Sequence, residues 1–231
     1  MAHLVKPLHA IEAPLSLSIV LDQLREAHRF LAFHGALALR QAAQPHDQFD
    51  YWGTDVKRTK VLLPSGARPE LIDASIHEHS LTEVYNQCAT MERLIDAMRW
   101  ALEALPGYGV LRCHPTTSSQ KATSSDIPDN DMVLVGPGGE IARFEVSDIA
   151  NRTADSNNKL KKELDSLGIT DAITTGWPTG RLFVVVSSEF ATLIRKRGSS
   201  TYAARRHFVL DLCYEHERTC IFEAKAQPLG L

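Results

Sequence analysis

The sequence lacks the features that mark membrane and secreted proteins. Its longest apolar stretches, Ile141–Val146, which is broken by Arg143, and Leu182–Val186, have the length of a β-strand and are far too short to span a membrane. Residues 1–21 carry scattered charges and two prolines without a clean apolar stretch, a pattern that does not fit a signal peptide. We therefore expect a cytoplasmic protein that has no membrane partner.

The chain also lacks a large excess of charge of one sign and a disulfide framework. The 25 basic and 28 acidic side chains give a formal net charge of −3, which excludes a histone-like protein that is basic throughout. The four cysteines are spread without a framework spacing and are expected to be reduced thiols. A phosphate-binding loop is absent, because the glycines of residues 136–139 form a turn that leads into a strand rather than a helix. A local basic surface is still compatible with this balance.

The apolar pattern divides the chain into a helical front and a strand-rich back. A period near 3.6 predicts helices over Leu15–Ala43 and Thr82–Leu105, the second without a complete capping box at Thr82. A short helix is predicted over Pro69–His79. The expected organisation is an N-terminal helical and irregular segment, residues 1–80, packed on an α/β core formed by residues 81–231.

After residue 108 the pattern becomes that of strands with two short helices between them. The turn at residues 136–139 predicts an antiparallel hairpin of the two strands that flank it. The fold class expected is α/β with a mixed sheet, in the order helix, strand, strand, strand, helix, strand, followed by a closing hairpin. The predicted segments are the strands Gly109–Cys113, Asp131–Val135, Ile141–Ser147 and Arg181–Ser188, the helices Asn157–Gly168 and Phe190–Arg197, and the hairpin strands His207–Tyr214 and Cys220–Ala224.

Two acidic residues lie on the strands of the central hairpin. Asp131 begins the first strand and Glu145 lies near the end of the second, so the two carboxylates should converge at one end of the sheet. Alternation along the strand places Glu145 and Ser147 on one face, and Phe144 and Val146 on the other. Converging carboxylates suit Mg²⁺, a hard cation that prefers oxygen ligands.

With these residues the chain resembles the PD-(D/E)xK nuclease superfamily of restriction and repair enzymes. The matching residues are Pro128-Asp129 or Asn130-Asp131, followed by Glu145-Val146-Ser147, and the similar region covers roughly Thr82–Ser188. The resemblance implies a restriction-endonuclease-like core and a DNA endonuclease, related to restriction or defence, that hydrolyses phosphodiester bonds. It also implies that Asp131 and Glu145 bind Mg²⁺ or Mn²⁺.

The sequence departs from this family at the motif lysine, whose position is occupied by Ser147. One interpretation is that the lysine has moved to the following helix, where Lys161 is the best candidate for the third catalytic residue. The alternative is a catalytically impaired nuclease-like module that binds nucleic acid or a protein partner. Glu92, in the middle of the first core helix, is a candidate for completing the metal site.

Basic residues gather near the C-terminal end of the chain. Between Phe190 and Leu210 there are five basic residues and no acidic one, which favours contacts with a phosphate backbone. The candidate DNA-binding residues are Arg195, Lys196, Arg197, Arg205 and Arg206.

A homodimer is a further expectation, because a two-fold protein matches a two-fold DNA site. A third hypothesis is an unrelated α/β interaction protein in which the acidic residues have no catalytic role.

Overall fold

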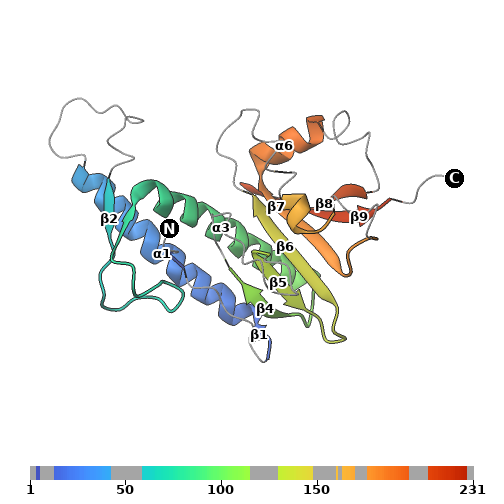
Figure 1. Ribbon diagram of the computed structural model, residues 1–231, viewed down its shortest axis with the longest axis horizontal. Coiled ribbons are helices and arrows are strands. Elements are labelled where there is room, and N and C mark those ends of the chain that lie inside the picture. The colour runs from blue at the N-terminus through green and yellow to red at the C-terminus, as the bar shows by residue number, and fades with distance from the viewer. Residues whose placement is uncertain are drawn as a thin grey trace.

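The computed structural model describes residues 4–5, 13–42, 59–114, 130–147, 160, 163–169, 176–197 and 208–227. A seven-stranded mixed sheet in the order β1-β4-β5-β6-β7-β9-β8 forms its centre (Figure 1). Only β6 and β7 are parallel neighbours in this sheet; the other neighbouring pairs are antiparallel. The strands are β1 (Leu15–Ser16), β4 (Gly109–Cys113), β5 (Met132–Val135), β6 (Ile141–Ser147), β7 (Arg181–Ser187), β8 (Phe208–His216) and β9 (Thr219–Ala226).

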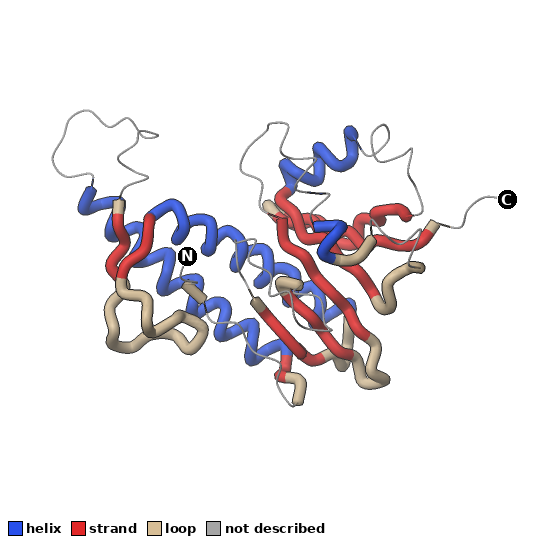
Figure 2. The backbone as a smooth tube through the Cα atoms, viewed as in Figure 1, coloured by secondary structure: helices blue, strands red, loops and turns tan. Residues whose placement is uncertain are grey.

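Two long helices pack side by side and cover one face of the sheet. They are α1 (Leu17–Ala42) and α3 (Leu81–Ala104), and they extend together beyond the sheet (Figures 1 and 2). A small antiparallel sheet of β2 (Lys60–Leu62) and β3 (Glu78–Ser80) lies at their far end. None of the helices in the described ranges is both long and apolar enough to cross a membrane.

An aromatic cluster joins the helices to this face. The rings of Phe144 and Phe183, on adjacent strands, stack with centroids 4.6 Å apart, and Trp100 of α3 meets Phe183 edge-on at 5.1 Å. Both phenylalanines are fully buried. Burial of such large apolar side chains is the main stabilising contribution on this face.

The opposite face of the sheet has its own, smaller core. Leu182, Val184 and Val186 of β7 contribute to it, and it is covered by Leu160, by residues 163–169 and by α6 (Ser188–Arg197). Because successive strand residues point to opposite faces, the apolar run of β7 supplies both cores at once. This confirms the strand predicted here from its continuous apolar sequence.

The helix predicted over Pro69–His79 is wrong. This segment contains turns and then enters β3, and its backbone carbonyls are bound by a single side chain. The guanidinium of Arg68 donates to the carbonyl oxygens of Leu63 at 2.6 Å, and of Asp73 and Ile76 at 2.7 Å each. An arginine that satisfies several carbonyls replaces the hydrogen bonds that a helix would supply, and the local apolar period cannot reveal it.

The start of α3 also differs from the expectation. The N-cap is Ser80, two residues before Thr82, and its hydroxyl accepts a hydrogen bond from the backbone N–H of Glu83 at 3.2 Å. Ser80 and Glu83 have the spacing of a capping box. The other predicted helices and strands that lie in the described ranges, including both hairpins, are confirmed to within about two residues.

Candidate functional site

Asp131 and Glu145 meet at the end of the β5–β6 hairpin. Met132 pairs with Phe144 in the hairpin register, which places the preceding Asp131 opposite Glu145. The Asp131 side chain also accepts a hydrogen bond at 2.7 Å from the backbone N–H of Val146. The convergence predicted from the hairpin is therefore confirmed, because register alone brings the start of one strand to the end of the other.

Glu145 lies on the face of the sheet that the sequence indicated, away from the aromatic cluster. It is 2% exposed, and its strand neighbour Val184 belongs to the smaller core. A carboxylate in such surroundings is costly to bury unless polar partners compensate for the lost water. One partner is Asn130, itself 1% exposed, whose Nδ2 donates to Glu145 Oε1 at 2.9 Å and to the carbonyl oxygen of Ser166 at 3.2 Å.

The negative charges at this site act on one another. Burial raises the pKa of Asp131 well above its ordinary value, and the nearby Glu145 carboxylate raises it further. The hydrogen bond from the Val146 N–H acts in the opposite direction, while a side-chain hydrogen bond with Glu145 and the charge of Glu163 add to the rise. Both burial and the neighbouring negative charge therefore act against the charged form of the Asp131 carboxyl.

The donor set fits a small divalent cation. Asn130 Oδ1 is buried, and neither it nor the buried Ser147 hydroxyl has a hydrogen-bond partner among the described residues. Two carboxylates and an unused amide oxygen are hard ligands, and Mg²⁺ is commonly held by one or two carboxylates together with water and phosphate oxygens. The described residues contain no group of three or more His, Cys, Asp and Glu side chains arranged to hold a metal ion, so protein ligands alone would leave coordination positions open.

The third catalytic residue of the prediction, Lys161, lies outside the described residues. The helical residues 163–166 that follow it contribute Glu163, a negative charge close enough to affect Asp131. At the family's lysine position the structure has the buried Ser147, which carries no charge. The described lysine side chains are engaged elsewhere, Lys60 with Glu78 at 2.5 Å and Lys225 with Asp211 at 3.0 Å.

Glu92 does not join this site, contrary to the expectation. It projects from α3 toward α1, where its Oε1 lies 3.1 Å from His28 Nε2. The hydrogen bond with His28 is the largest influence on the Glu92 carboxyl and lowers its pKa, and the charges of Arg93 and Arg218 act in the same direction. The first core helix covers the aromatic face of the sheet, whereas Glu145 points to the other face, and the linear sequence does not show this difference.

The five predicted DNA-binding residues are only partly within the described structure. Arg195 of α6 makes a two-pronged contact with Glu215 of β8, at 2.8 and 3.3 Å, so an acidic partner already offsets its charge. The side chains of Lys196 and Arg197, and the whole of Arg205 and Arg206, lie outside the described residues. Their role in DNA binding stays a prediction.

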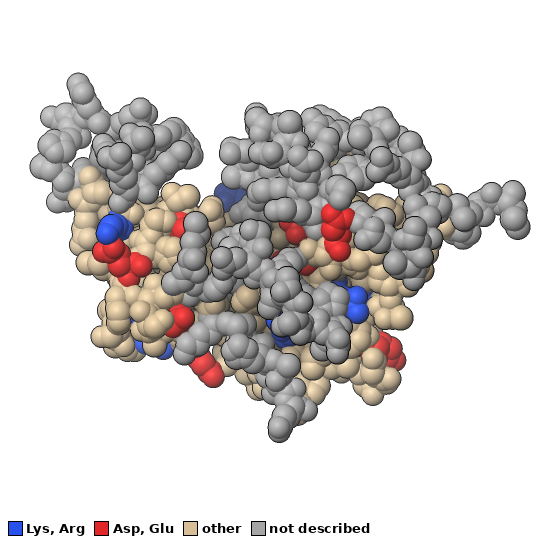
Figure 3. All heavy atoms as spheres, viewed as in Figure 1, with Lys and Arg blue, Asp and Glu red and all other residues tan. Residues whose placement is uncertain are grey.

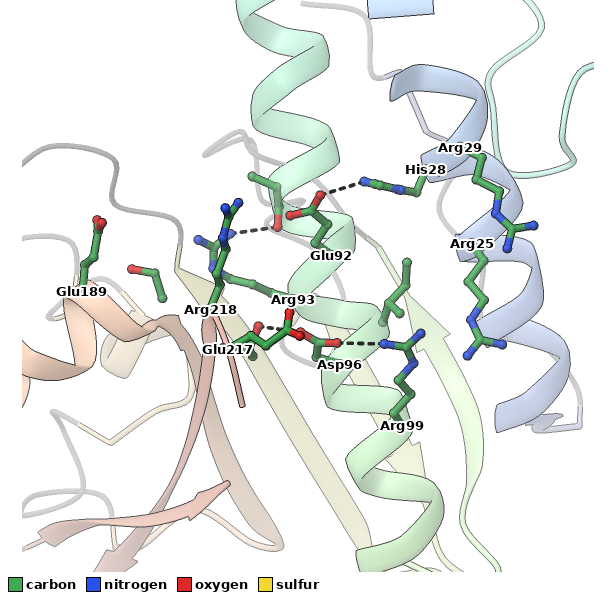
Figure 4. Close-up of a pocket in the computed structure, with 14 residues that line it drawn as sticks. Arg25, His28, Arg29, Glu92, Arg93, Asp96, Arg99, Glu189, Glu217 and Arg218 are labelled. Atoms are coloured by element: carbon green, nitrogen blue, oxygen red, sulfur yellow. Dashed lines mark hydrogen bonds and ion pairs between the residues drawn. The ribbon is translucent and has the colours of Figure 1, made fainter. Parts of the chain in front are cut away.

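Sequence reasoning missed a second polar region, which we call the arginine groove. It has a cavity volume of about 670 Å³ and opens between α1, α3 and the turn from β8 to β9 (Figure 4). Its basic residues are Arg25, His28 and Arg29 of α1, Arg93 and Arg99 of α3, and Arg218 of the turn. On each helix these residues lie on the polar face opposite the core, a pattern that indicates a solvated helix surface. The sequence pattern does not show that these two helix faces meet Arg218 of the turn in one groove.

On the face of the molecule drawn in Figure 3, charge is dispersed. In the view of Figure 3, the acidic and basic side chains among the described residues form small separate groups rather than one patch.

Comparison with known proteins adds no assignment, since no family model, curated protein or solved structure is significantly similar to this chain. The site must therefore be interpreted from its own chemistry.

Proposed function

We propose that the protein is a metal-dependent nuclease that hydrolyses phosphodiester bonds of DNA at the Asp131–Glu145 pair. The observation that carries this proposal is the close pair of carboxyl groups at the end of the central hairpin, with Glu145 buried and Asp131 half-buried, next to Asn130, whose buried amide oxygen has no partner among the described residues. Such an arrangement reduces stability without a cation, and retained destabilising polar groups are typical of functional sites.

Each residue of the site has a definite role in the proposal. Asp131 and Glu145 would hold Mg²⁺ or Mn²⁺, and Asn130 orients Glu145 through its Nδ2 hydrogen bond, while its buried Oδ1 has no partner among the described residues. The Val146 N–H keeps the Asp131 carboxylate in place. The bound cation supplies an activated water and neutralises charge that develops on the phosphate.

The order of elements around the pair supports the same proposal. The helix α3, the three antiparallel strands β4, β5 and β6, the helical residues 163–166 and the parallel strand β7 follow one another as the PD-(D/E)xK resemblance implies. Asp131 immediately precedes the second of these strands, and Glu145 lies on the third. A restriction-endonuclease-like core, a cytoplasmic location and a homodimer that acts in restriction or defence belong to this proposal as predictions.

A second candidate function is a nuclease-like module that binds DNA or a protein partner but does not cleave. It is favoured by Ser147, a small uncharged side chain, 1% exposed, at the position where the family has a lysine. Without a positive charge at this position, the developing negative charge on the phosphate is less stabilised. Lys161 decides between the two candidates, since the nuclease proposal assigns it the missing charge.

Cleavage of supercoiled plasmid DNA, with Mg²⁺ or Mn²⁺ and with EDTA, tests the proposal. We expect metal-dependent nicking that falls more than about 100-fold in Asp131→Asn and in Glu145→Gln, because each removes one anionic ligand. Glu140→Gln is the matched control: it removes an exposed carboxylate at the opposite, turn end of the same hairpin and should leave cleavage unchanged. Equal cleavage by all three variants would contradict the nuclease proposal.

Metal binding gives a readout that is independent of cleavage. Titration calorimetry with Mn²⁺ should detect binding to the wild-type protein and to Glu140→Gln, and much weaker binding to Asp131→Asn. Metal binding without any cleavage, together with DNA binding, would favour the non-cleaving module. If neither metal binding nor cleavage is detected, both the proposed Mg²⁺ site and the nuclease proposal are contradicted.

A further inference from the structure

Two of the four carboxylates in the arginine groove are already compensated within it. Glu92 contacts His28 at 3.1 Å, and Asp96 contacts Arg99 at 3.3 Å and accepts a hydrogen bond from the Thr219 hydroxyl at 2.7 Å (Figure 4). Five arginines and four carboxylates line the groove, and Arg25 also contacts Asp22 of the same helix at 3.1 Å, so the groove as a whole is close to charge balance. An anionic ligand is favoured at those arginines whose charge no nearby carboxylate offsets.

Arg29 and Arg218 are the guanidinium groups that stay open to such a ligand. Both residues are exposed, and neither guanidinium has a hydrogen bond or an ion pair with another residue in the described ranges. In Figure 4 they stand on opposite sides of the groove, Arg29 on α1 and Arg218 across α3. A ligand that engages both must carry several negative charges along an extended shape, which describes a phosphodiester backbone better than a single phosphate ion.

The remaining two carboxylates are exposed and are screened by water. Glu189 lies in the first turn of α6, at the far side of the view in Figure 4 from the α1 arginines. Glu217 precedes Arg218 in the two-residue turn and has a φ of 45°, a backbone conformation that usually needs glycine or asparagine. The turn thus keeps a charged residue in a strained backbone conformation, although glycine or asparagine would be more stable at this position.

The groove opens at the same end of the sheet as the acid pair. Ser187, which lines the groove, ends β7, and Glu145 lies beside Val184 in the parallel register of β6 and β7. Ser187 lies three positions beyond Val184, about 10 Å along the strand, and the two residues point to opposite faces, so the groove and the acid pair adjoin the same end of the sheet from its two faces. A DNA segment of several nucleotides that passes over this end is long enough to approach both, because neighbouring phosphates of one strand advance by about 3.4 Å along the helix axis.

We propose that the arginine groove binds phosphate groups of the DNA backbone next to the segment held at Asp131 and Glu145. This inference rests on the proposed function for the identity of its ligand. Arginine suits the role because its planar guanidinium forms two parallel hydrogen bonds to a phosphate and stays charged at every physiological pH. Binding here is independent of base sequence and positions the DNA over the end of the sheet.

The test is DNA binding by the full-length chain, measured in EDTA so that no cleavage takes place. Fluorescence anisotropy follows a labelled duplex of about 20 base pairs at salt concentrations from about 50 to about 200 mM. We expect the double variant Arg29→Ala/Arg218→Ala to lose at least about 10-fold in affinity, and its slope of log affinity against log salt to fall by about two, because two phosphate contacts are lost. Glu217→Gln should bind more tightly, because it removes an acidic residue from the groove.

Arg40→Ala is the matched control. Arg40 is an exposed arginine in the last turn of the same helix, about 16 Å along the axis from Arg29, and it does not line the groove. It should keep the wild-type affinity within about twofold and the same salt slope. Circular dichroism melting curves confirm that each variant is folded.

The outcomes separate this inference from the nuclease proposal. Loss of affinity and slope in the double variant supports the groove, and it does so even if the wild-type protein cleaves nothing. Wild-type affinity and slope in the double variant, or an effect of Arg40→Ala as large as that of the double variant, overturns the inference, even if cleavage at Asp131 and Glu145 is established. Absence of DNA binding by the wild-type protein overturns it as well.

Discussion

The two faces of the central sheet carry different kinds of side chain at adjacent positions of one strand. On one face, Phe144 of β6 is fully buried under α1 and α3 with apolar neighbours; on the other, Glu145 is 2% exposed and bound to Asn130. The first face gains stability from apolar area removed from water. The second gives up stability to hold a carboxylate pair, which indicates that function rather than folding maintains it.

The largest effect should come from the apolar face. Phe144→Ala removes a ring that stacks on Phe183 and is expected to lower the free energy of unfolding by about 3–5 kcal/mol. Phe33→Ala, at a residue of α1 that is 64% exposed, should change it by less than about 0.5 kcal/mol. Chemical denaturation measures both, and a cost below about 1 kcal/mol for Phe144→Ala would contradict the difference between the faces.

A smaller, pH-dependent effect should come from the polar face. In EDTA, the folded-state pKa of Asp131 lies above the ordinary 3.8, so the folded protein keeps a proton that the unfolded chain releases. The resulting stabilisation is fully present below about pH 3.8 and is lost as pH rises through the folded-state pKa, at up to about 1.4 kcal/mol per pH unit.

Asp131→Asn isolates this contribution. The difference in unfolding free energy between the wild-type protein and Asp131→Asn, from urea denaturation across a pH series, should shift in favour of the variant as pH rises above about 4. Contributions from the other titrating groups largely cancel in the difference. Parallel pH profiles would show that Asp131 titrates normally and would contradict the burial of charge on this face.

The smallest effects compare two serines. Ser80→Ala removes the N-cap of α3 and should cost about 1 kcal/mol, because the Glu83 N–H loses its acceptor. Ser147→Ala removes a buried hydroxyl that has no hydrogen-bond partner among the described residues, and the change should lie within about 0.5 kcal/mol of zero. Thermal unfolding in EDTA compares them; a cost at Ser147 equal to that at Ser80 would mean that its hydroxyl has a partner.

Local patterns in the sequence were sufficient for most elements and for the acid pair. The turn at residues 136–139 sets the register of the hairpin, and register with strand alternation places Asp131 beside Glu145 on the face opposite Phe144. These are short-range consequences of backbone geometry. The failures are long-range: Arg68 binds the carbonyls that a predicted helix would have used, and Glu92 points toward His28 of another helix.

By itself, the sequence determined the element order, the alternation that separates apolar from polar faces, and the convergence of two carboxylates at a strand end. Only the tertiary structure decided that Asn130 orients Glu145, that α3 covers the aromatic face, and that Arg29 and Arg218 border one groove. The physical reason is the range of the interactions. Periodicity and register act over a few residues of one chain segment, whereas a groove depends on how separate elements pack, which the whole core determines.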